Sequence, residues 1–188
     1  MRRSRTVSGA VLIVLGGRPG TGKSTLARAL ARAVNGVWLR ADSIEHAMRR
    51  WPAVAAIDLG PAGYYAMQAM AADALAVGHR VIADCVNPFE VTRRDWAAVA
   101  RAAGAALLQV EVRCSDPAVH RHRVETRTSE IPGFVLPSWA EVEARPFEPW
   151  PGADLCLDTA RLGVDEALAR MRAALERHPK NGNHFSGE

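Results

Sequence analysis

The chain contains almost no lysine. Of its 24 basic residues only Lys23 and Lys180 are lysines, and the others are arginines. The formal net charge is +4, and the arginines are spread along the chain instead of forming the single basic stripe that is typical of nucleic-acid binding. Because positive charge is otherwise supplied by arginine, Lys23 stands out as a candidate functional residue.

Cysteine and long apolar runs are also scarce. Cys85, Cys114 and Cys156 are odd in number and far apart, so neither a disulfide framework nor a metal-binding spacing is indicated, and we expect a cytoplasmic protein. No segment approaches the roughly 20 apolar residues needed to span a bilayer. The basic residues at the start precede an apolar stretch too short for a signal peptide, so we expect a solvated tail followed by a strand.

Length and patterning predict one α/β domain. We expect it to span residues 1–178, followed by a disordered tail over 179–188. Short apolar runs alternate with longer helical patterns, which is typical of a parallel sheet. The expected strands cover residues 10–15, 37–40, 80–85, 106–112 and 154–157. The expected helices cover residues 26–34, 44–50, 62–77, 90–103, 118–128, 138–144 and 164–177.

A glycine-punctuated loop between the first strand and the first helix fits the P-loop pattern G-x-x-x-x-G-K-[ST], with Gly17, Gly22, Lys23 and Ser24 at the fixed positions. Glycines let main-chain N–H groups converge closely on a polyphosphate, and the following helix adds its positive N-terminal end. Lys23 is expected to reach the β- and γ-phosphates, and the Ser24 hydroxyl to bind Mg²⁺. The expected ATP-binding residues of the loop are Gly17, Pro19, Gly20, Thr21, Gly22, Lys23, Ser24 and Thr25.

The order of the motifs resembles that of a known group of enzymes. The P-loop is followed by Asp42 after the second strand, Asp84 at the end of the third, and an arginine-bearing helix. With the runs LRADSI, VIADCVNP, VEVRCSDPAVHRHRVETR and LDTA, residues 11–175 resemble the small P-loop kinases of the nucleoside-monophosphate-kinase type, above all the predicted kinases of the AAA family ATPase group. Relatives include gluconate kinases, chloramphenicol phosphotransferases and polynucleotide kinase domains. The resemblance implies a P-loop NTPase three-layer sandwich with a five-stranded parallel sheet and a helical lid over about residues 116–150.

Two aspartates are candidate site residues. The resemblance implies that Asp42 orients the acceptor hydroxyl and takes its proton, although it is also suited to cap the following helix. Asp84 follows the apolar run 81–83, as the Mg²⁺-binding carboxylate of a P-loop protein does, although an aspartate there can also simply begin a turn. Several relatives carry an acceptor-binding arginine three residues after the first aspartate. Here that position is Glu45, and Arg40, Arg49 or Arg50 are candidate replacements.

Arginines on the helix expected at 118–128 are candidate lid residues. Arg123 and Arg127 are four residues apart, on one helical face, and Arg121 precedes them. Guanidinium groups can stabilise the charge on a transferring phosphoryl group and help to exclude water. The alternative is a solvated face paired with Glu125 and Glu130.

The remaining candidates are weaker. By analogy with relatives, Asp158 and Thr159 lie where the adenine is held by main-chain groups. Asn87 is placed to reach the acceptor. The histidines do not cluster and are interpreted as surface residues. The aromatic residues are candidates for an acceptor pocket, but are more often core anchors; they are Trp51, Tyr64, Tyr65, Trp139 and Trp150.

These features predict an ATP- and Mg²⁺-dependent kinase that moves the γ-phosphoryl group to a hydroxyl of a small molecule, acting as a monomer or homodimer without a membrane partner. One alternative is a polynucleotide 5′-hydroxyl kinase, which the absence of a basic stripe with interleaved aromatic residues disfavours. Another is a nucleotide-switched ATPase that acts as a binding protein. Such a switch would have no need of Asp42.

Overall fold

The computed structural model describes residues 9–177, and the tails expected at both ends of the chain lie outside this range. Five strands form one parallel sheet in the order β2-β3-β1-β4-β5. Their bounds are β1 (Val11–Gly16), β2 (Val37–Arg40), β3 (Arg80–Asp84), β4 (Ala106–Arg113) and β5 (Leu155–Asp158). The predicted five-stranded parallel sheet is therefore confirmed.

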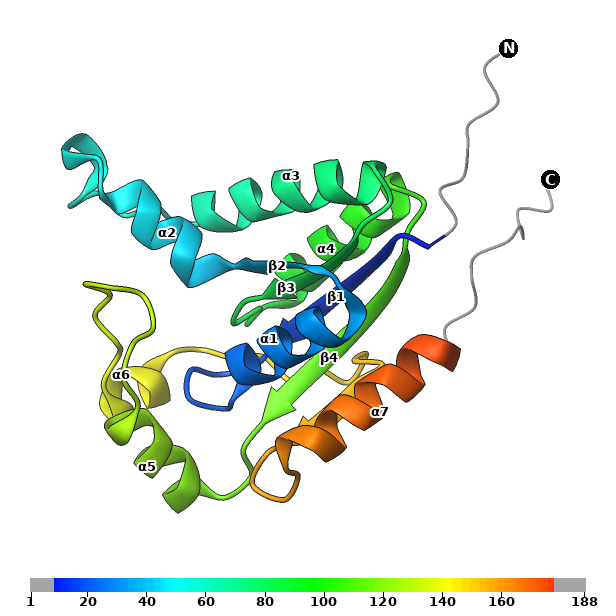
Figure 1. Cartoon of the computed structure of the whole chain (residues 1–188). Helices are drawn as coiled ribbons and strands as arrows, with labels where there is room; N and C mark the ends of the chain where they lie inside the picture. Colours follow the sequence, from blue (N-terminus) through cyan, green and yellow to red (C-terminus); the bar gives the residue numbers. More distant parts are fainter. Residues whose placement is uncertain (1–8, 178–188) are drawn as a thin grey trace, which may run out of the picture.

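Helices cover both faces of the sheet, which gives three layers (Figure 1). Helices α3 and α4 pack on one face, and α1 and α7 pack on the other. The helices are α1 (Lys23–Val34), α2 (Ala41–Arg49), α3 (Ala62–Ala76), α4 (Glu90–Ala102), α5 (Pro117–Thr126), α6 (Trp139–Ala144) and α7 (Val164–Arg177), with a short 3-10 helix at Pro52–Val54. No helix among residues 9–177 is long and apolar enough to cross a membrane.

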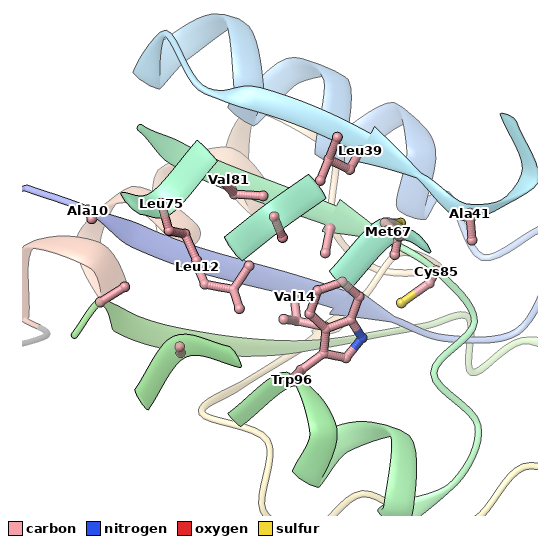
Figure 2. Packing of buried hydrophobic residues seen from close by; sticks show 14 residues of the cluster. Ala10, Leu12, Val14, Leu39, Ala41, Met67, Leu75, Val81, Cys85 and Trp96 are labelled. Carbon is pink, nitrogen blue, oxygen red and sulfur yellow. The ribbon is translucent and has the colours of Figure 1, made fainter. Parts of the chain in front are cut away.

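The alternation of side chains along β1 builds two cores. Leu12 and Val14 point to the layer of α3 and α4, where they pack near the fully buried Trp96 (Figure 2). Ile13 and Leu15 point to the layer of α1 and α7. Because successive strand residues face opposite sides, a short apolar run with no polar position is suited to a central strand covered on both faces.

Several helix ends differ from the prediction, and at α2 and α5 the difference moves candidate site residues. Helix α2 begins at Ala41, with Arg40 at its N-cap, so the interpretation of Asp42 or Ser43 as the cap is wrong. Asp42 instead lies in the first turn. Helix α5 ends at Thr126, and Arg127 follows it with extended backbone. Arg127 therefore does not share a helical face with Arg123.

The carboxyl ends of the strands are flanked by α2 on one side and by α5 and α6 on the other (Figure 1). Open α/β sheets bind their ligands at this edge, because the loops that follow the strands converge there. Helix α6 begins with a capping box, in which Ser138 and Glu141 exchange hydrogen bonds. The segment expected to form a lid therefore contains two short helices joined by the loop over residues 127–138.

Candidate active site

The loop between β1 and α1 adopts a conformation that requires glycine. Gly17, Gly20 and Gly22 have φ angles of 147°, 85° and 92°. A Cβ atom at Gly17 would lie 2.0 Å from the main-chain oxygen of Val112, so no side chain fits there. The Gly17 N–H donates to the oxygen of Val86 at 2.9 Å. These contacts shape the loop around the start of α1, whose first N–H groups are free to bind an anion.

Lys23 is the first residue of α1 and is buried, with only 8% of its surface exposed. Its position in the motif suggested an exposed place in the loop, but the structure places it in the helix. Its Nζ donates to the main-chain oxygen of Arg18 at 3.2 Å. Burial lowers the pKa of the Lys23 amine, while Asp84 and Asp42 oppose that shift. Asp84 and Asp42 offset only part of the cost of burying this charged amine, and a bound polyphosphate would offset the rest.

Two cavities meet over Lys23. The large cavity, of about 420 Å³, lies between the P-loop, the end of α5 and the segment after β5. The small cavity, of about 190 Å³, lies between the ends of β2 and β3 and the segment 134–145. Both are lined by Lys23, Ser24, Arg40, Arg127 and Leu136. A group bound at this junction would be in contact with the contents of both cavities.

Asp42 lines the small cavity and not the large one. Its side chain is 45% exposed, and its Oδ2 lies 3.6 Å from Nη2 of Arg40. Asp42 and Lys23 thus line the same cavity, and the Asp42 carboxylate opposes the lowering of the Lys23 pKa by burial.

Asp84 also lines the small cavity but is deeply buried, with 2% of its surface exposed. Trp38 Nε1 donates to its Oδ2 at 3.3 Å. Burial raises the pKa of the Asp84 carboxyl, and the Lys23 amine and the Ser24 hydroxyl act in the opposite direction.

The two oxygen donors Ser24 and Asp84 fit a Mg²⁺ ion. Mg²⁺ prefers oxygen ligands and commonly takes only one or two from the protein, with the rest from phosphates and water. Within residues 9–177 no group of three His, Cys, Asp or Glu side chains is gathered as a self-sufficient metal site. A divalent cation beside Asp84 would offset the cost of burying that carboxylate.

The three candidate lid arginines occupy different environments. Arg121 points outward, with its Nε 2.8 Å from Oε1 of Glu125, so it is a surface residue. Arg123 lines the large cavity and donates to Oγ1 and the main-chain oxygen of Thr159 at 2.8 and 3.0 Å. Arg127 lies at the junction of the cavities, and its buried Nε and Nη2 make no hydrogen bond within the described residues. The alternative pairing with acidic residues holds for Arg121 only.

These environments predict different kinetic effects for the three alanine variants. Arg127→Ala is expected to lower kcat by about 10–100-fold, the value of a hydrogen bond to a charged group, with little change in ATP affinity. Arg123→Ala is expected to raise KM for ATP more than it lowers kcat. The hydrogen bonds of Arg123 to Thr159 join α5 to the segment after β5, and both of these line the large cavity in which we expect ATP to bind. Arg121→Ala is the matched control and should resemble the wild type. Steady-state ADP formation checks the series, and full activity of Arg127→Ala would contradict it.

Thr159 and Asp158 play different parts. The Thr159 hydroxyl donates to the main-chain oxygen of Thr21 at 2.8 Å, and the residue lines the large cavity. Asp158 lines neither cavity, and its Oδ1 accepts hydrogen bonds from the N–H groups of Ser115 and Ala160. The Asp158 side chain thus shapes the turn beside the large cavity. Of the other predicted loop residues, Gly20, Gly22 and Thr25 line the large cavity and Pro19 the small one.

Thr21 and Gly17 line neither of these two cavities, but a third of about 220 Å³ behind the loop. The Thr21 hydroxyl donates to the main-chain oxygen of Arg18 at 2.9 Å, so this residue organises the loop from inside.

Three other contacts around the loop were missed from the sequence. His120, interpreted as a surface residue, is buried, with its Nε2 2.8 Å from the main-chain oxygen of Pro19. Nη1 of Arg18 donates to the main-chain oxygens of Val142 and Arg145, both at 2.8 Å. Arg145 itself lines the small cavity. All three contacts join distant parts of the chain, so the only local signal was the spacing of His120 and the buried Val124 on one face of α5.

Asn87, predicted to reach the acceptor, lines neither of the two cavities. It is fully buried, and its N–H donates to the Tyr64 hydroxyl at 2.8 Å. Trp150 is buried over Gly16, as a core anchor would be. Trp51 and Tyr65 are exposed and line neither of the two cavities.

Comparisons with known proteins agree with this fold. Solved structures with the same fold include a gluconokinase from Sinorhizobium meliloti 1021 (21% identity, TM-score 0.62, covering 92% of this chain and 94% of that chain). An APS kinase of Mycobacterium tuberculosis in complex with AMPPNP and APS is 19% identical (TM-score 0.64, 89% and 98% covered). A sugar kinase from Janibacter sp. HTCC2649 is 17% identical (TM-score 0.62, 93% and 99% covered).

The family of the chain is shown by a family model that matches most of it. Among curated proteins, none matches this sequence. The model of the AAA domain family matches residues 12–136, which include the P-loop, Asp42, Asp84, Arg123 and Arg127. The protein is therefore a P-loop protein with the fold of these solved kinases, and the chain belongs to the AAA domain family.

Proposed function

We propose that the protein is an ATP- and Mg²⁺-dependent kinase that transfers the γ-phosphoryl group to a hydroxyl of a small molecule. The observation that carries this proposal is the meeting of the two cavities at Lys23, Ser24, Arg40 and Arg127. In this proposal the large cavity holds ATP and the small cavity holds the acceptor. The γ-phosphate then lies at the junction, within reach of both.

The nucleotide is held by the loop and the start of α1. Main-chain N–H groups near Gly22 and the buried Lys23 amine bind the β- and γ-phosphates. Thr159 and Arg123 lie along the large cavity, where the nucleoside extends away from the loop. Ser24 and Asp84 would hold Mg²⁺, and the ion would supply positive charge that neutralises part of the phosphate charge.

The transfer step requires the acceptor hydroxyl to be placed in line with the γ-phosphorus. Asp42 orients this hydroxyl and accepts its proton. The acceptor oxygen forms a bond to the γ-phosphorus while the bond from that phosphorus to the β,γ-bridging oxygen breaks, and ADP leaves. Arg127 donates hydrogen bonds to the equatorial oxygens as their charge is redistributed.

Water must be kept out because it would compete as an acceptor. The segment after α5 contributes Phe134, Val135 and Leu136 to the wall of the small cavity. Helix α5 is fixed on the loop through the contact of His120 with Pro19, so closure would involve the loop after Thr126 more than the helix itself.

The proposal is tested by measuring ADP formation from ATP and Mg²⁺ with a panel of alcohols, nucleosides and hydroxylated antibiotics. We expect one class of acceptor to accelerate ADP formation over the rate without acceptor, and mass spectrometry to detect the phosphorylated product. Steady release of phosphate that no acceptor accelerates would instead support a nucleotide-switched ATPase. A small cavity of about 190 Å³, below the usual range of ligand pockets, does not favour a polynucleotide end as the acceptor.

A further inference from the structure

The small cavity contains more positive charge than the proposed phosphoryl transfer uses. Its cationic lining residues are Lys23, Arg40, Arg127 and Arg145. In the proposed function Lys23 and Arg127 are engaged by the γ-phosphate, because both also line the large cavity. Arg145 lines the small cavity but not the large one. Binding of the nucleotide therefore gives no role to the positive charge of Arg145.

The nearby carboxylates act on Arg145 only from a distance, since the guanidinium favours the charged forms of Glu45 and Glu141 without forming an ion pair within residues 9–177. Glu141 is held by the N–H and the hydroxyl of Ser138, each at 2.7 Å, in the capping box of α6. Glu45 packs against Gly63 of α3 and does not line the small cavity. Asp42 has Arg40 as its neighbour at 3.6 Å. Within residues 9–177, Arg145 makes no ion pair with any of them.

The position of Arg145 is nevertheless fixed by the P-loop. Its main-chain oxygen accepts a hydrogen bond from Nη1 of Arg18, which also binds the oxygen of Val142. The Arg18 guanidinium carbon lies 5.6 Å from the centre of the Phe147 ring. The segment that bears Arg145 is thus tied to the loop that holds the nucleotide, so its side chain is presented to the same small cavity as Asp42.

We infer that the acceptor is a small alcohol that carries one anionic group, a carboxylate or a phosphate, and that Arg145 binds this group. The inference rests on the proposed function, because it takes the small cavity as the acceptor site. The hydroxyl lies beside Asp42 and the anionic group lies beside Arg145. Arg145 is exposed, so a neutral alcohol would leave its guanidinium to water, whereas an anionic group would pair with it; the charge therefore favours acids over their neutral analogues.

The experiment compares matched probes by isothermal titration, with and without saturating Mg²⁺ and AMPPNP. The probes are glycerate, glycerol 3-phosphate and glycerol. We expect measurable binding of at least one of the two anions and none of glycerol. The anion that binds with the higher affinity identifies the carboxylate or the phosphate as the preferred group. Arg145→Gln should weaken anion binding by about tenfold, the loss of a charge-assisted hydrogen bond, while AMPPNP binding stays within about twofold. Arg172→Gln, on the exposed side of α7, is the matched control.

Failure of the inference and failure of the proposed function give different results. Binding of glycerol as tight as that of the anions, no binding of either anion, or equal anion binding by the wild type and Arg145→Gln, would overturn the inference. Failure to bind AMPPNP would overturn the proposed function. The titrations without nucleotide would still report on the anion site in that case.

Discussion

Replacing Lys23 with alanine is expected to reduce phosphoryl transfer by about 10²–10³-fold while the chain stays folded, because one electrostatic contact to the transferring group is lost. The fold should tolerate the change. The buried amine has a pKa lowered by burial, so its charged form costs free energy in the absence of nucleotide. The oxygen of Arg18 that accepts from Lys23 also accepts from the Thr21 hydroxyl at 2.9 Å and keeps a partner.

Lys23→Met serves as the second variant, since it keeps most of the side-chain volume and removes only the charge. Both variants should lose ADP formation, and thermal unfolding should show that both remain folded. The loss should appear in kcat/KM and in AMPPNP affinity together, because the amine contacts phosphates in the ground state as well as in the transition state. Wild-type ADP formation by a folded Lys23→Ala protein would exclude this loop as the catalytic ATP site.

The sequence predicted the elements whose signals are local. The strands are recognised because they are short apolar runs bounded by glycines, and the P-loop because its glycines recur at a fixed spacing. The order of the strands in the sheet involves pairing between distant segments, such as β1 with β4, and periodicity alone does not specify it. The same reason explains why the contact of Arg18 with residues 142 and 145 was missed.

The errors in the predicted site also have physical causes. The helix at 118–128 was drawn too long because the pattern continues past Thr126, whereas Arg127 leaves the helix with extended backbone and enters the junction of the cavities. Asp42 was considered as a cap because aspartate is favoured there, yet Arg40 occupies that position at the end of β2. In both cases the observed helix boundary brings a charged side chain towards Lys23. Tertiary packing determines these boundaries, and local propensity does not.

The replacements Asp42→Asn and Asp84→Asn are expected to separate two roles in the same small cavity. If Asp42 accepts the acceptor proton, Asp42→Asn should lower kcat by about 10²–10⁴-fold, the usual contribution of general base catalysis, with AMPPNP affinity nearly unchanged. Asp42→Asn should cost little stability, because the Asp42 side chain is 45% exposed and its ion pair within residues 9–177 is a loose one, with Arg40 at 3.6 Å.

Asp84→Asn should behave differently, because its effect should depend on the metal. The amide oxygen of asparagine can still accept from Trp38 Nε1, which now donates to Asp84 Oδ2 at 3.3 Å. Burial already raises the pKa of the Asp84 carboxyl, so a neutral side chain of the same shape should not destabilise the fold. What is lost is the anionic oxygen for Mg²⁺, and raising the Mg²⁺ concentration should restore part of the activity of Asp84→Asn and none of that of Asp42→Asn. If both variants show the same Mg²⁺ dependence and the same nucleotide affinity, the division of roles between the two aspartates is wrong.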